Sequence, residues 1–225
     1  MNIILQHYEG RLGELEKLSV ENIKSYADQI GADYKLVTGK PFREHLTLPC
    51  QKVCLINEEW DNYDNVLMLD PDVFVRKNLI KNVFNVPGHG INGAVQNRLK
   101  NALIEKDRIN KQAPYWGGSI YKFSLEERQK LRSMIPDNDK WLELYNKAYH
   151  FEDEGILAEL ASKCNLGISY LDFKWNQCSF LPKPEEAYMI HVRTKLSGQV
   201  NGTWENGGKR KKIENYYELN ARGII

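Results

Sequence analysis

The sequence predicts an α/β fold in which a mostly parallel central sheet is flanked by helices. Two observations lead to this prediction. Short apolar segments typical of buried strands alternate with longer segments whose apolar residues recur at helical spacing. The order strand, helix, strand is also the pattern of a parallel sheet, because each crossover needs about the length of a helix. On such sheets, ligands bind at the carboxyl ends of the strands.

The first half of the chain begins with an apolar strand and a long amphipathic segment. Leu15, Ile23 and Ala27 mark the apolar face of that segment. The predicted elements are, in order, a strand at Ile3–Gln6, a helix over residues 12–30, a strand at Tyr34–Val37, a helix over residues 48–60 and a strand over residues 65–75.

The second half continues the alternation. Ser124 and Glu127 form a Ser-x-x-Glu capping box, which predicts the start of a helix. Three acids at residues 152–154 favour the start of another helix, because negative charge stabilises the amino-terminal end of the helix dipole. The predicted elements are strands over residues 91–97 and 117–124, helices over residues 124–135 and 151–162, and strands over residues 166–176 and 187–192. We expect residues 1–198 to form a single domain. Residues 199–225, which are rich in Gly and Asn and then basic, are expected to form a flexible tail.

The charge balance argues against two broad classes of partner. The 31 basic and 30 acidic side chains leave a net charge of +1, so no global field favours nucleic acid or an anionic membrane. No segment has the length of a membrane span, and the amino-terminal residues lack the basic region of a signal peptide. Cysteines without zinc-site spacing are expected to be free thiols and favour a cytoplasmic location; they are Cys50, Cys54, Cys164 and Cys178.

The segment YDNVLMLDPDVFV, residues 63–75, ends a buried strand with two carboxylates, Asp70 and Asp72. A buried carboxylate is costly unless it is paired or bound to a cation. Two carboxylates at i and i+2 project to the same side of an extended chain, so one divalent cation could bind both. The alternative is a polar turn at the end of a strand, since Asp and Pro are common in turns. We favour the metal site.

These pieces together resemble the GT-A glycosyltransferases, whose nucleotide-binding half carries an Asp-x-Asp motif. The likeness covers about residues 3–198, and its later segments follow in the family's order: PYWGGSIYKFS, FEDEGILAEL, LDFKWNQ and MIHVRTKLSG. It is nearest to the glycogenin-like branch, and a glycosyltransferase domain from a large algal virus is the suggested relative. That source would place the protein in the host cytoplasm.

The resemblance implies a metal-dependent transfer of a sugar from a nucleotide-diphosphate donor, with UDP-sugars favoured, to a glycan or glycoprotein hydroxyl. A divalent cation would neutralise the leaving diphosphate. His191 would join Asp70 and Asp72 as a ligand, which favours Mn²⁺, with Mg²⁺ as the alternative. The basic residues of HVRTK, Arg193 and Lys195, would contact the phosphates. By itself, a histidine at a strand end is more often satisfied by a backbone carbonyl.

Further donor and sugar contacts are implied by position. Tyr8, just after the first strand, would contact the nucleobase, and Lys52 would contact the donor together with Asp70. An ordinary loop tyrosine and a solvated helix lysine are equally good interpretations of these two residues. Sugar pockets often combine an aromatic wall with glycines that let the ligand come close to the backbone. Trp116, Gly117 and Gly118 are expected to form such a pocket for the sugar and acceptor, with Glu154 beside them.

The helix start at residues 151–154 is the candidate for the catalytic carboxylate. Inverting relatives use an Asp here to deprotonate the acceptor hydroxyl, whereas retaining glycogenin-like relatives carry an Asp-Gln pair. This chain has Asp153–Glu154. The resemblance therefore assigns Asp153 as the base and favours inversion. The alternative is a helix start whose acids only stabilise the helix dipole.

Two rival functions come from other classes. Haloacid-dehalogenase-type phosphatases also place Asp-x-Asp after an apolar strand, but usually on the first strand and with Thr or Val four residues after the nucleophile, where this chain has Phe74. A carbohydrate-binding protein on the same frame without turnover is the non-enzyme alternative. Hydrolysis of a nucleotide sugar in the presence of metal would distinguish an enzyme from such a binding protein.

Overall fold

The computed structural model of the chain describes residues 1–92, 94–147, 152–193 and 208–225. Across these ranges, the central sheet has four strands in the order β2-β1-β3-β5. The strands are β1 (Asn2–His7), β2 (Asp33–Val37), β3 (Asn65–Leu69) and β5 (Ile120–Ser124). β1 pairs in parallel with β2 and β3, while β5 is antiparallel to β3. The predicted α/β class with a mostly parallel sheet is confirmed.

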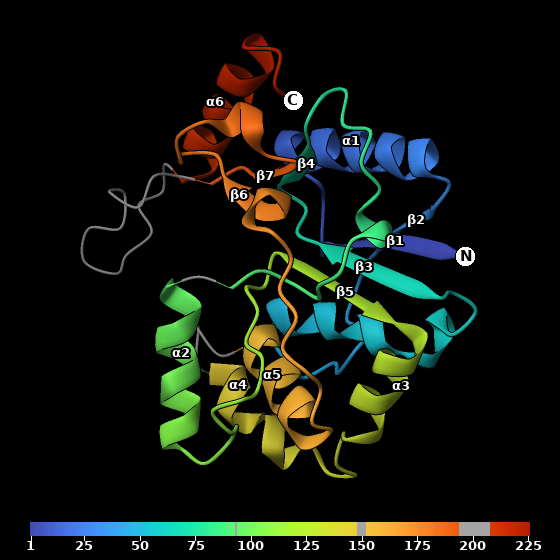
Figure 1. The fold of residues 1–225 in the computed structure, drawn as a ribbon, viewed down its shortest axis with the longest axis vertical. Helices are drawn as coiled ribbons and strands as arrows, with labels where there is room; N and C mark the ends of the chain where they lie inside the picture. Colours follow the sequence, from blue (N-terminus) through green and yellow to red (C-terminus); the bar gives the residue numbers. More distant parts are fainter. Residues whose placement is uncertain (93, 148–151, 194–207) are drawn as a thin grey trace.

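A smaller sheet lies at the carboxyl end of β3. Its order in the described residues is β4-β7-β6, formed by β4 (Val73–Val75), β7 (Met189–His191) and β6 (Gln177–Cys178). β4 and β7 are antiparallel, with Val73 opposite His191. The chain therefore returns, more than a hundred residues later, to the turn that follows β3 (Figure 1).

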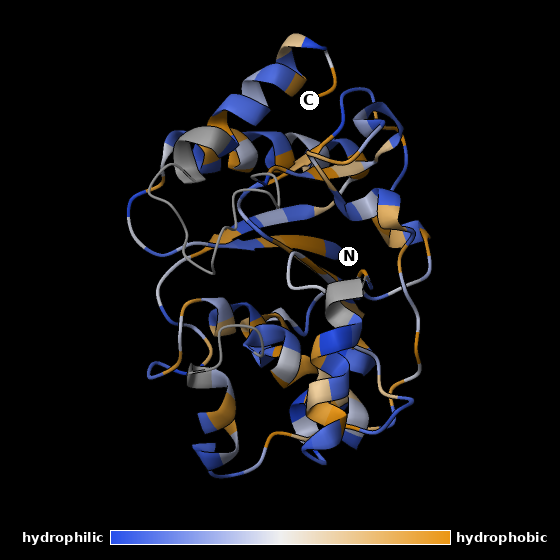
Figure 2. Cartoon of the chain, turned by 90° about the vertical axis from the view of Figure 1, so that its left-hand side faces the viewer, coloured by the Kyte–Doolittle hydropathy of each residue, from blue (hydrophilic) through white to orange (hydrophobic). Residues whose placement is uncertain are grey.

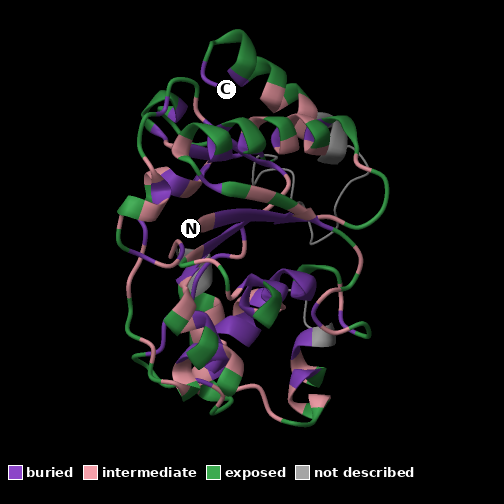
Figure 3. Cartoon of the chain, turned by 90° about the vertical axis from the view of Figure 1, so that its right-hand side faces the viewer, coloured by how far each residue is buried: buried purple, intermediate pink, exposed green. Residues whose placement is uncertain are grey.

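Helices cover both faces of the central sheet (Figure 1). α1 (Glu14–Ile30) lies on one face, and α3 (Leu125–Ser133) and α5 (Asp153–Lys163) lie on the other. The strand residues alternate between these faces, as period-2 geometry requires. Ile3 and Leu5 join the cluster that includes α5, whereas Ile4 joins the cluster beneath α1. Figure 2 shows the apolar strands between the helices, and Figure 3 shows that the outer face of α1 is exposed.

The ends of two helices follow from local sequence. α1 ends at Gly31, which adopts the left-handed conformation (φ 67°) that glycine accepts without strain. α3 begins at the predicted capping box, because the Ser124 hydroxyl accepts from the Glu127 amide and the Glu127 carboxylate accepts from the Ser124 amide. The remaining helices are α2 (Ala94–Glu105), α4 (Glu143–Lys147) and α6 (Gly208–Ala221).

Three predicted elements are corrected by the structure. Residues 48–60 form two 3₁₀ helices, η1 (Pro49–Ile56) and η2 (Glu58–Trp60), instead of one α-helix. Residues 94–97 begin α2 and are not a strand. Residues 166–176 are extended without a paired ladder and end in the 3₁₀ helix η5 (Phe173–Asn176). Short 3₁₀ turns also occur at η3 (Val83–Asn85), η4 (Asp139–Leu142) and η6 (Pro184–Glu186).

The expectation of a flexible carboxy-terminal tail is corrected for residues 208–225. α6 lies beside α1 and the small sheet (Figure 1). Leu219, Ile224 and Ile225 are buried there against Phe74 of β4 and Val192, which follows β7. Burial of large aliphatic side chains is what holds a terminal segment in place. The predicted boundary at residue 198 falls outside the described residues.

Two further features bear on the sequence predictions. All four cysteines are free thiols, as expected from their spacing. Among the described residues, no helix combines the length and the apolar character that crossing a membrane requires.

Candidate active site

The turn after β3 and the end of β7 bring three potential metal ligands together. Asp70 directly follows β3, and Asp72 directly precedes β4. The pairing of Val73 with His191, and the hydrogen bond from the Val192 amide to the Asp72 carbonyl (2.9 Å), fix the histidine beside the turn. The pairing of β7 with β4 thus places His191 beside Asp72, as the expected set of ligands requires.

The donor atoms of this trio suit a divalent cation. One ligand atom from each of Asp70, Asp72 and His191 lies within 4.8 Å of the other two. His191 Nε2 is 2.9 Å from Asp72 Oδ1 and 3.9 Å from Asp70 Oδ2. Two carboxylates and one imidazole are a plausible set for Mn²⁺, and the oxygen ligands also suit Mg²⁺. The residues present therefore fit the predicted cation.

Both carboxylate oxygens of Asp72 have a nitrogen partner. Oδ1 lies against His191, and Oδ2 lies 2.6 Å from the ammonium of Lys212 on α6. Burial alone raises the pKa of Asp72, but His191 and Lys212 outweigh burial and hold that pKa well below its ordinary value. Asp72 is therefore a carboxylate, the form that binds a cation.

α1 and β1 hold the backbone of the Asp70–Asp72 turn. The buried amide of Gln6 donates to the Asp70 carbonyl (3.1 Å) and to the Ser19 hydroxyl (3.0 Å). Ser19 in turn donates to the Val73 carbonyl at 2.7 Å, and Asn22 exchanges two hydrogen bonds with the backbone of Val75. Because these bonds span both sides of the turn, the two carboxylates project from a fixed backbone.

A second, more deeply buried cluster shares Asp70 with the first. The Lys52 ammonium, on η1, lies 2.8 Å from Asp70 Oδ1 and 2.9 Å from Asp153 Oδ2, and it donates to the Gly118 carbonyl. Tyr121 donates to Asp153 Oδ2 at 2.9 Å. Burial lowers the pKa of Lys52, but Asp153 and Asp70 reverse the effect and raise it, so Lys52 stays charged.

Asp153 and Glu154 are the first two residues of α5, and their carboxyls lie against the backbone of Gly118. The Gly118 amide donates to Glu154 Oε1 at 2.7 Å, and a Cβ on Gly118 would come within 3.0 Å of Asp153 Oδ2. Burial raises the pKa of Asp153, Lys52 lowers it, and the nearby Asp70 raises it again. The net effect is a raised pKa. Burial and the adjacent Asp153 raise the pKa of Glu154 to about 8. Gly118 is the residue that leaves room for this close approach.

The other predicted site residues occupy varied environments. Tyr8 follows β1 at the same sheet edge as Asp70, is half-buried and donates its amide to the Val37 carbonyl at 3.0 Å. Arg193 is exposed, two residues beyond His191. The indole of Trp116 is fully buried and packs against His89 and Phe123, while the Gly117 amide donates to Ile91. The roles of these residues in binding stay predictions, and Lys195 lies outside the described residues.

The fold is similar to those of glycosyltransferases of known structure. No protein-family model matches the sequence, and no match was found among curated proteins. A glycosyltransferase involved in the glycosylation of the major capsid of PBCV-1 matches 96% of this chain and 98% of its own, with 13% identity and a TM-score of 0.60. The galactosyltransferase LgtC, in complex with donor and acceptor sugar analogs, matches 99% of this chain and 100% of its own, with 14% identity and a TM-score of 0.54.

The chain has a GT-A glycosyltransferase fold. The resemblance inferred from its sequence is thus confirmed at the level of the fold. In this GT-A fold, the trio Asp70, Asp72 and His191 and the cluster around Lys52 occupy the carboxyl ends of the central strands, where α/β proteins bind ligands.

Sequence reasoning missed three residues of these clusters. Lys212 belongs to a basic run, but nothing local indicated that it reaches Asp72. Tyr121 on β5 donates to Asp153. Because side chains alternate along a strand, its position next to Ile120 could have indicated that Tyr121 faces the side opposite to Ile120. Gln6 is a polar residue inside a buried strand, which should have marked it as a hydrogen-bonding residue.

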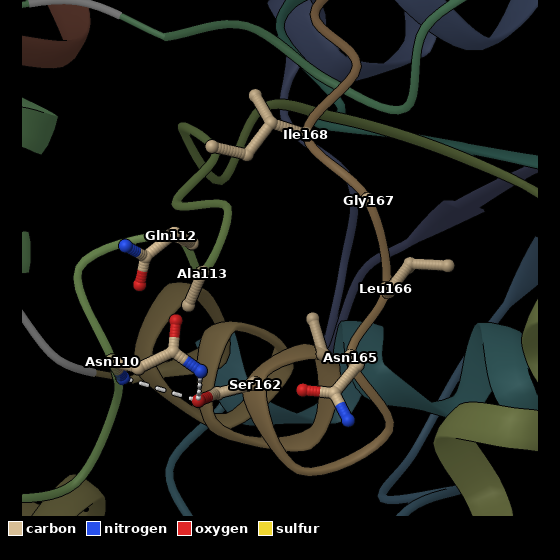
Figure 4. Close-up of a pocket in the computed structure, with 9 residues that line it drawn as sticks. Asn110, Gln112, Ala113, Ser162, Asn165, Leu166, Gly167 and Ile168 are labelled. Atoms are coloured by element: carbon tan, nitrogen blue, oxygen red, sulfur yellow. Dashed lines mark hydrogen bonds between the residues drawn. The ribbon is translucent and has the colours of Figure 1, made fainter.

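A surface cavity of about 490 Å³ lies away from these clusters, between the loop before β5 and the carboxyl end of α5 (Figure 4). Asn110 donates twice to the Ser162 hydroxyl at its floor, at 3.2 and 3.1 Å. None of the predicted site residues lines it. The lining residues are Asn110, Gln112, Ala113, Ala161, Ser162, Asn165, Leu166, Gly167 and Ile168.

Proposed function

We propose that the protein is a metal-dependent glycosyltransferase. It moves a sugar from a nucleotide-diphosphate donor, with UDP-sugars favoured, to a hydroxyl of a glycan or glycoprotein acceptor. The observation that carries the proposal is the adjacency of two clusters on a GT-A fold. A trio of potential metal ligands, Asp70, Asp72 and His191, is joined through Asp70 to the buried pair Lys52–Asp153. Charge neutralisation and proton removal are the two tasks that glycosyl transfer requires.

Asp70, Asp72 and His191 would hold Mn²⁺, or Mg²⁺ in its place. A bound divalent cation supplies neutralisation of the negative charge that develops on the leaving diphosphate. Arg193 and Lys195 follow His191 in sequence and are proposed to contact the same phosphates, as Lys52 is proposed to contact the donor. Tyr8 is proposed to contact the nucleobase, and Trp116, Gly117, Gly118 and Glu154 are proposed to shape the sugar and acceptor pocket.

Asp153 is proposed as the general base in an inverting reaction. It would accept the proton of the acceptor hydroxyl as that oxygen attacks the anomeric carbon. Its burial at a helix start holds the carboxyl rigidly, and Lys52 favours the ionised form while burial and Asp70 raise the pKa. A base with a raised pKa accepts a proton more readily at neutral pH.

The decisive experiment incubates the protein with a panel of nucleotide sugars and Mn²⁺. It measures the release of nucleoside diphosphate and determines the anomeric configuration of the product. Asp72→Asn removes charge but little volume. We expect it to lower metal-dependent turnover about a hundredfold or more, because several kcal/mol of charge stabilisation are lost. Full activity of that variant, or full activity in excess chelator, would overturn the metal mechanism. A product that keeps the donor's configuration would overturn inversion.

The binding-protein rival is tested by the same panel, and the phosphatase rival by an added phosphomonoester. A carbohydrate-binding protein without turnover would bind a nucleotide sugar, visible as a thermal shift, and leave it intact. A phosphatase would release inorganic phosphate from a phosphomonoester without any nucleotide sugar. The fold match over nearly the whole chain favours the transferase.

A further inference from the structure

The contact between Lys212 and Asp72 is not explained by the proposed role of either residue. The Lys212 ammonium lies 2.6 Å from Asp72 Oδ2, and both side chains are largely withdrawn from solvent, with 26% and 12% of their surface exposed. Asp72 is a proposed cation ligand, so an ammonium group stands directly beside the place where a divalent cation would bind. Lys212 comes from α6, which none of the sequence motifs included.

α6 is held firmly enough to position this side chain. Tyr216 packs its ring on Phe74 of β4, with centroids 4.9 Å apart. Asn215 donates to the Arg193 carbonyl at 2.7 Å, and the Lys77 amide donates to the Ile224 carbonyl at 2.8 Å. These contacts link α6 to the small sheet that carries Asp72 and His191. The position of the Lys212 ammonium is therefore set by the fold.

The charge of Lys212 should have opposite effects on the binding of the cation and on the binding of the donor diphosphate. A positive charge within one side chain's reach of a cation site repels an incoming divalent cation, and it competes for the same Asp72 carboxylate. The same charge attracts a diphosphate, which carries several negative charges. Partial exposure of Lys212 moderates both effects, because water screens them.

We propose that Lys212 couples the binding of the cation to the binding of the donor diphosphate. Without ligands, Lys212 neutralises Asp72 and weakens binding of the cation alone. When cation and diphosphate are both present, the cation takes the carboxylate and Lys212 pairs with a phosphate oxygen. The inference rests on the proposed function and deepens it by assigning a further residue to the same site. Since coupling is reciprocal, each ligand strengthens the binding of the other.

The test measures binding instead of turnover and uses probes that do not depend on the nucleobase. Mn²⁺ alone is titrated into the full chain and followed by the EPR signal of the free ion. The preformed Mn²⁺–pyrophosphate complex is titrated separately by calorimetry. For Lys212→Met, which keeps the length of the side chain without its charge, we expect Mn²⁺ alone to bind about three- to tenfold more tightly and the complex to bind more weakly by a similar factor.

Two control variants separate the charge of Lys212 from the integrity of α6. Lys212→Arg should restore both affinities towards those of the wild type, because it restores the charge. Arg222→Gln removes a positive charge just beyond the same helix, where Arg222 pairs with Glu185 at 3.3 Å, and should leave both affinities unchanged. Circular dichroism and thermal melts establish that each variant is folded.

The opposite directions of the two shifts are the signature of coupling. If Lys212→Met weakens both titrations, Lys212 only supports the structure of Asp72, and the inference is overturned. It is also overturned if neither affinity changes, while the metal-dependent function stands on the wild-type titrations. If the wild-type chain binds neither Mn²⁺ nor its pyrophosphate complex, the metal part of the proposed function fails and the coupling fails with it.

Discussion

Asp153 and Glu159 lie on the same helix, α5, and are equally buried, each with 4% of its surface exposed, yet their surroundings differ. Glu159 has two cations of its own: Arg108 at 2.7 Å and Lys163 at 3.1 Å. Tyr145 donates a further hydrogen bond to it. Within the described ranges, Asp153 has one cation, Lys52, which it shares with Asp70.

The difference separates a structural carboxylate from one suited to chemistry. The charge of Glu159 is fully matched, so removing it would leave Arg108 without its partner. Asp153 lies instead beside Glu154 and near Asp70, and it shares the ammonium of Lys52 with Asp70. Excess negative charge in a buried site raises pKa values and is costly for folding, which is the condition expected of functional residues. Burial alone would not distinguish the two positions.

The largest expected effect follows from Asp153→Asn. This variant removes the proposed base while keeping its volume, so we expect glycosyl transfer to fall by about 10²- to 10⁴-fold. The raised pKa of Asp153 means that the fold disfavours its ionised form. Replacing it with a neutral amide should therefore leave the free energy of unfolding near the wild-type value. Initial rates with the donor found in the panel, together with urea unfolding, measure both. A collapse of donor affinity would show that Asp153 serves binding instead.

The matched variant Glu159→Gln should have the reverse profile. It leaves Arg108 without a counter-charge, and breaking a buried ion pair costs about 3–5 kcal/mol. Since Arg108 is partly exposed, we expect the free energy of unfolding to fall by about 2–3 kcal/mol, with turnover per folded molecule unchanged. Urea denaturation and rates normalised to the folded fraction test this. Equal loss of stability in both variants would remove the distinction between the two carboxylates.

Local patterns were sufficient to predict the elements that position the site. The apolar run before Asp70 marked β3, and Ser124 with Glu127 marked the start of α3, because both signals depend on neighbours in sequence. The meeting of Asp72 with His191 was expected from the family resemblance. The α/β class therefore followed from patterns within short windows of the chain, whereas the GT-A fold was expected from the family resemblance.

The errors had two sources, a helical spacing that was overlooked and contacts between segments far apart in the sequence. Residues 91–97 contain Ile91 and Val95 and suggested a strand, but Leu99 and Leu103 continue an i, i+4 spacing that belongs to α2. Residues 166–172 make only an isolated bridge, between Tyr170 and Gly90, with the Leu171 amide donating to the Gly90 carbonyl, and so form no strand of a ladder. The contact of Lys212 with Asp72 depends on how α6 packs on the small sheet, which no local pattern specifies.

The carboxyl of Glu154 should make the free energy of unfolding depend on pH. Burial and Asp153 raise its pKa from an ordinary value near 4.5 to about 8. The folded state therefore holds a proton that the unfolded state releases, so stability is greatest below about pH 4.5 and falls as pH rises towards 8. Glu154→Gln should flatten this part of the profile. Thermal melts from pH 5 to 8 test the slope, and an unchanged slope would contradict the raised pKa.

The smallest effect is expected from Lys163→Met, which removes the more exposed of the two cations at Glu159. Lys163 and Glu159 form an i, i+4 pair on α5, and 37% of the Lys163 side chain is exposed. Exposed pairs of this kind contribute less than about 1 kcal/mol, and Arg108 still neutralises the carboxylate. We therefore expect the free energy of unfolding to fall by less than about 1 kcal/mol, with transfer unaffected. A double-mutant cycle with Glu159→Gln measures the pair directly. A loss comparable to that of Glu159→Gln alone would mean that Lys163, and not Arg108, provides the charge balance that distinguishes Glu159 from Asp153.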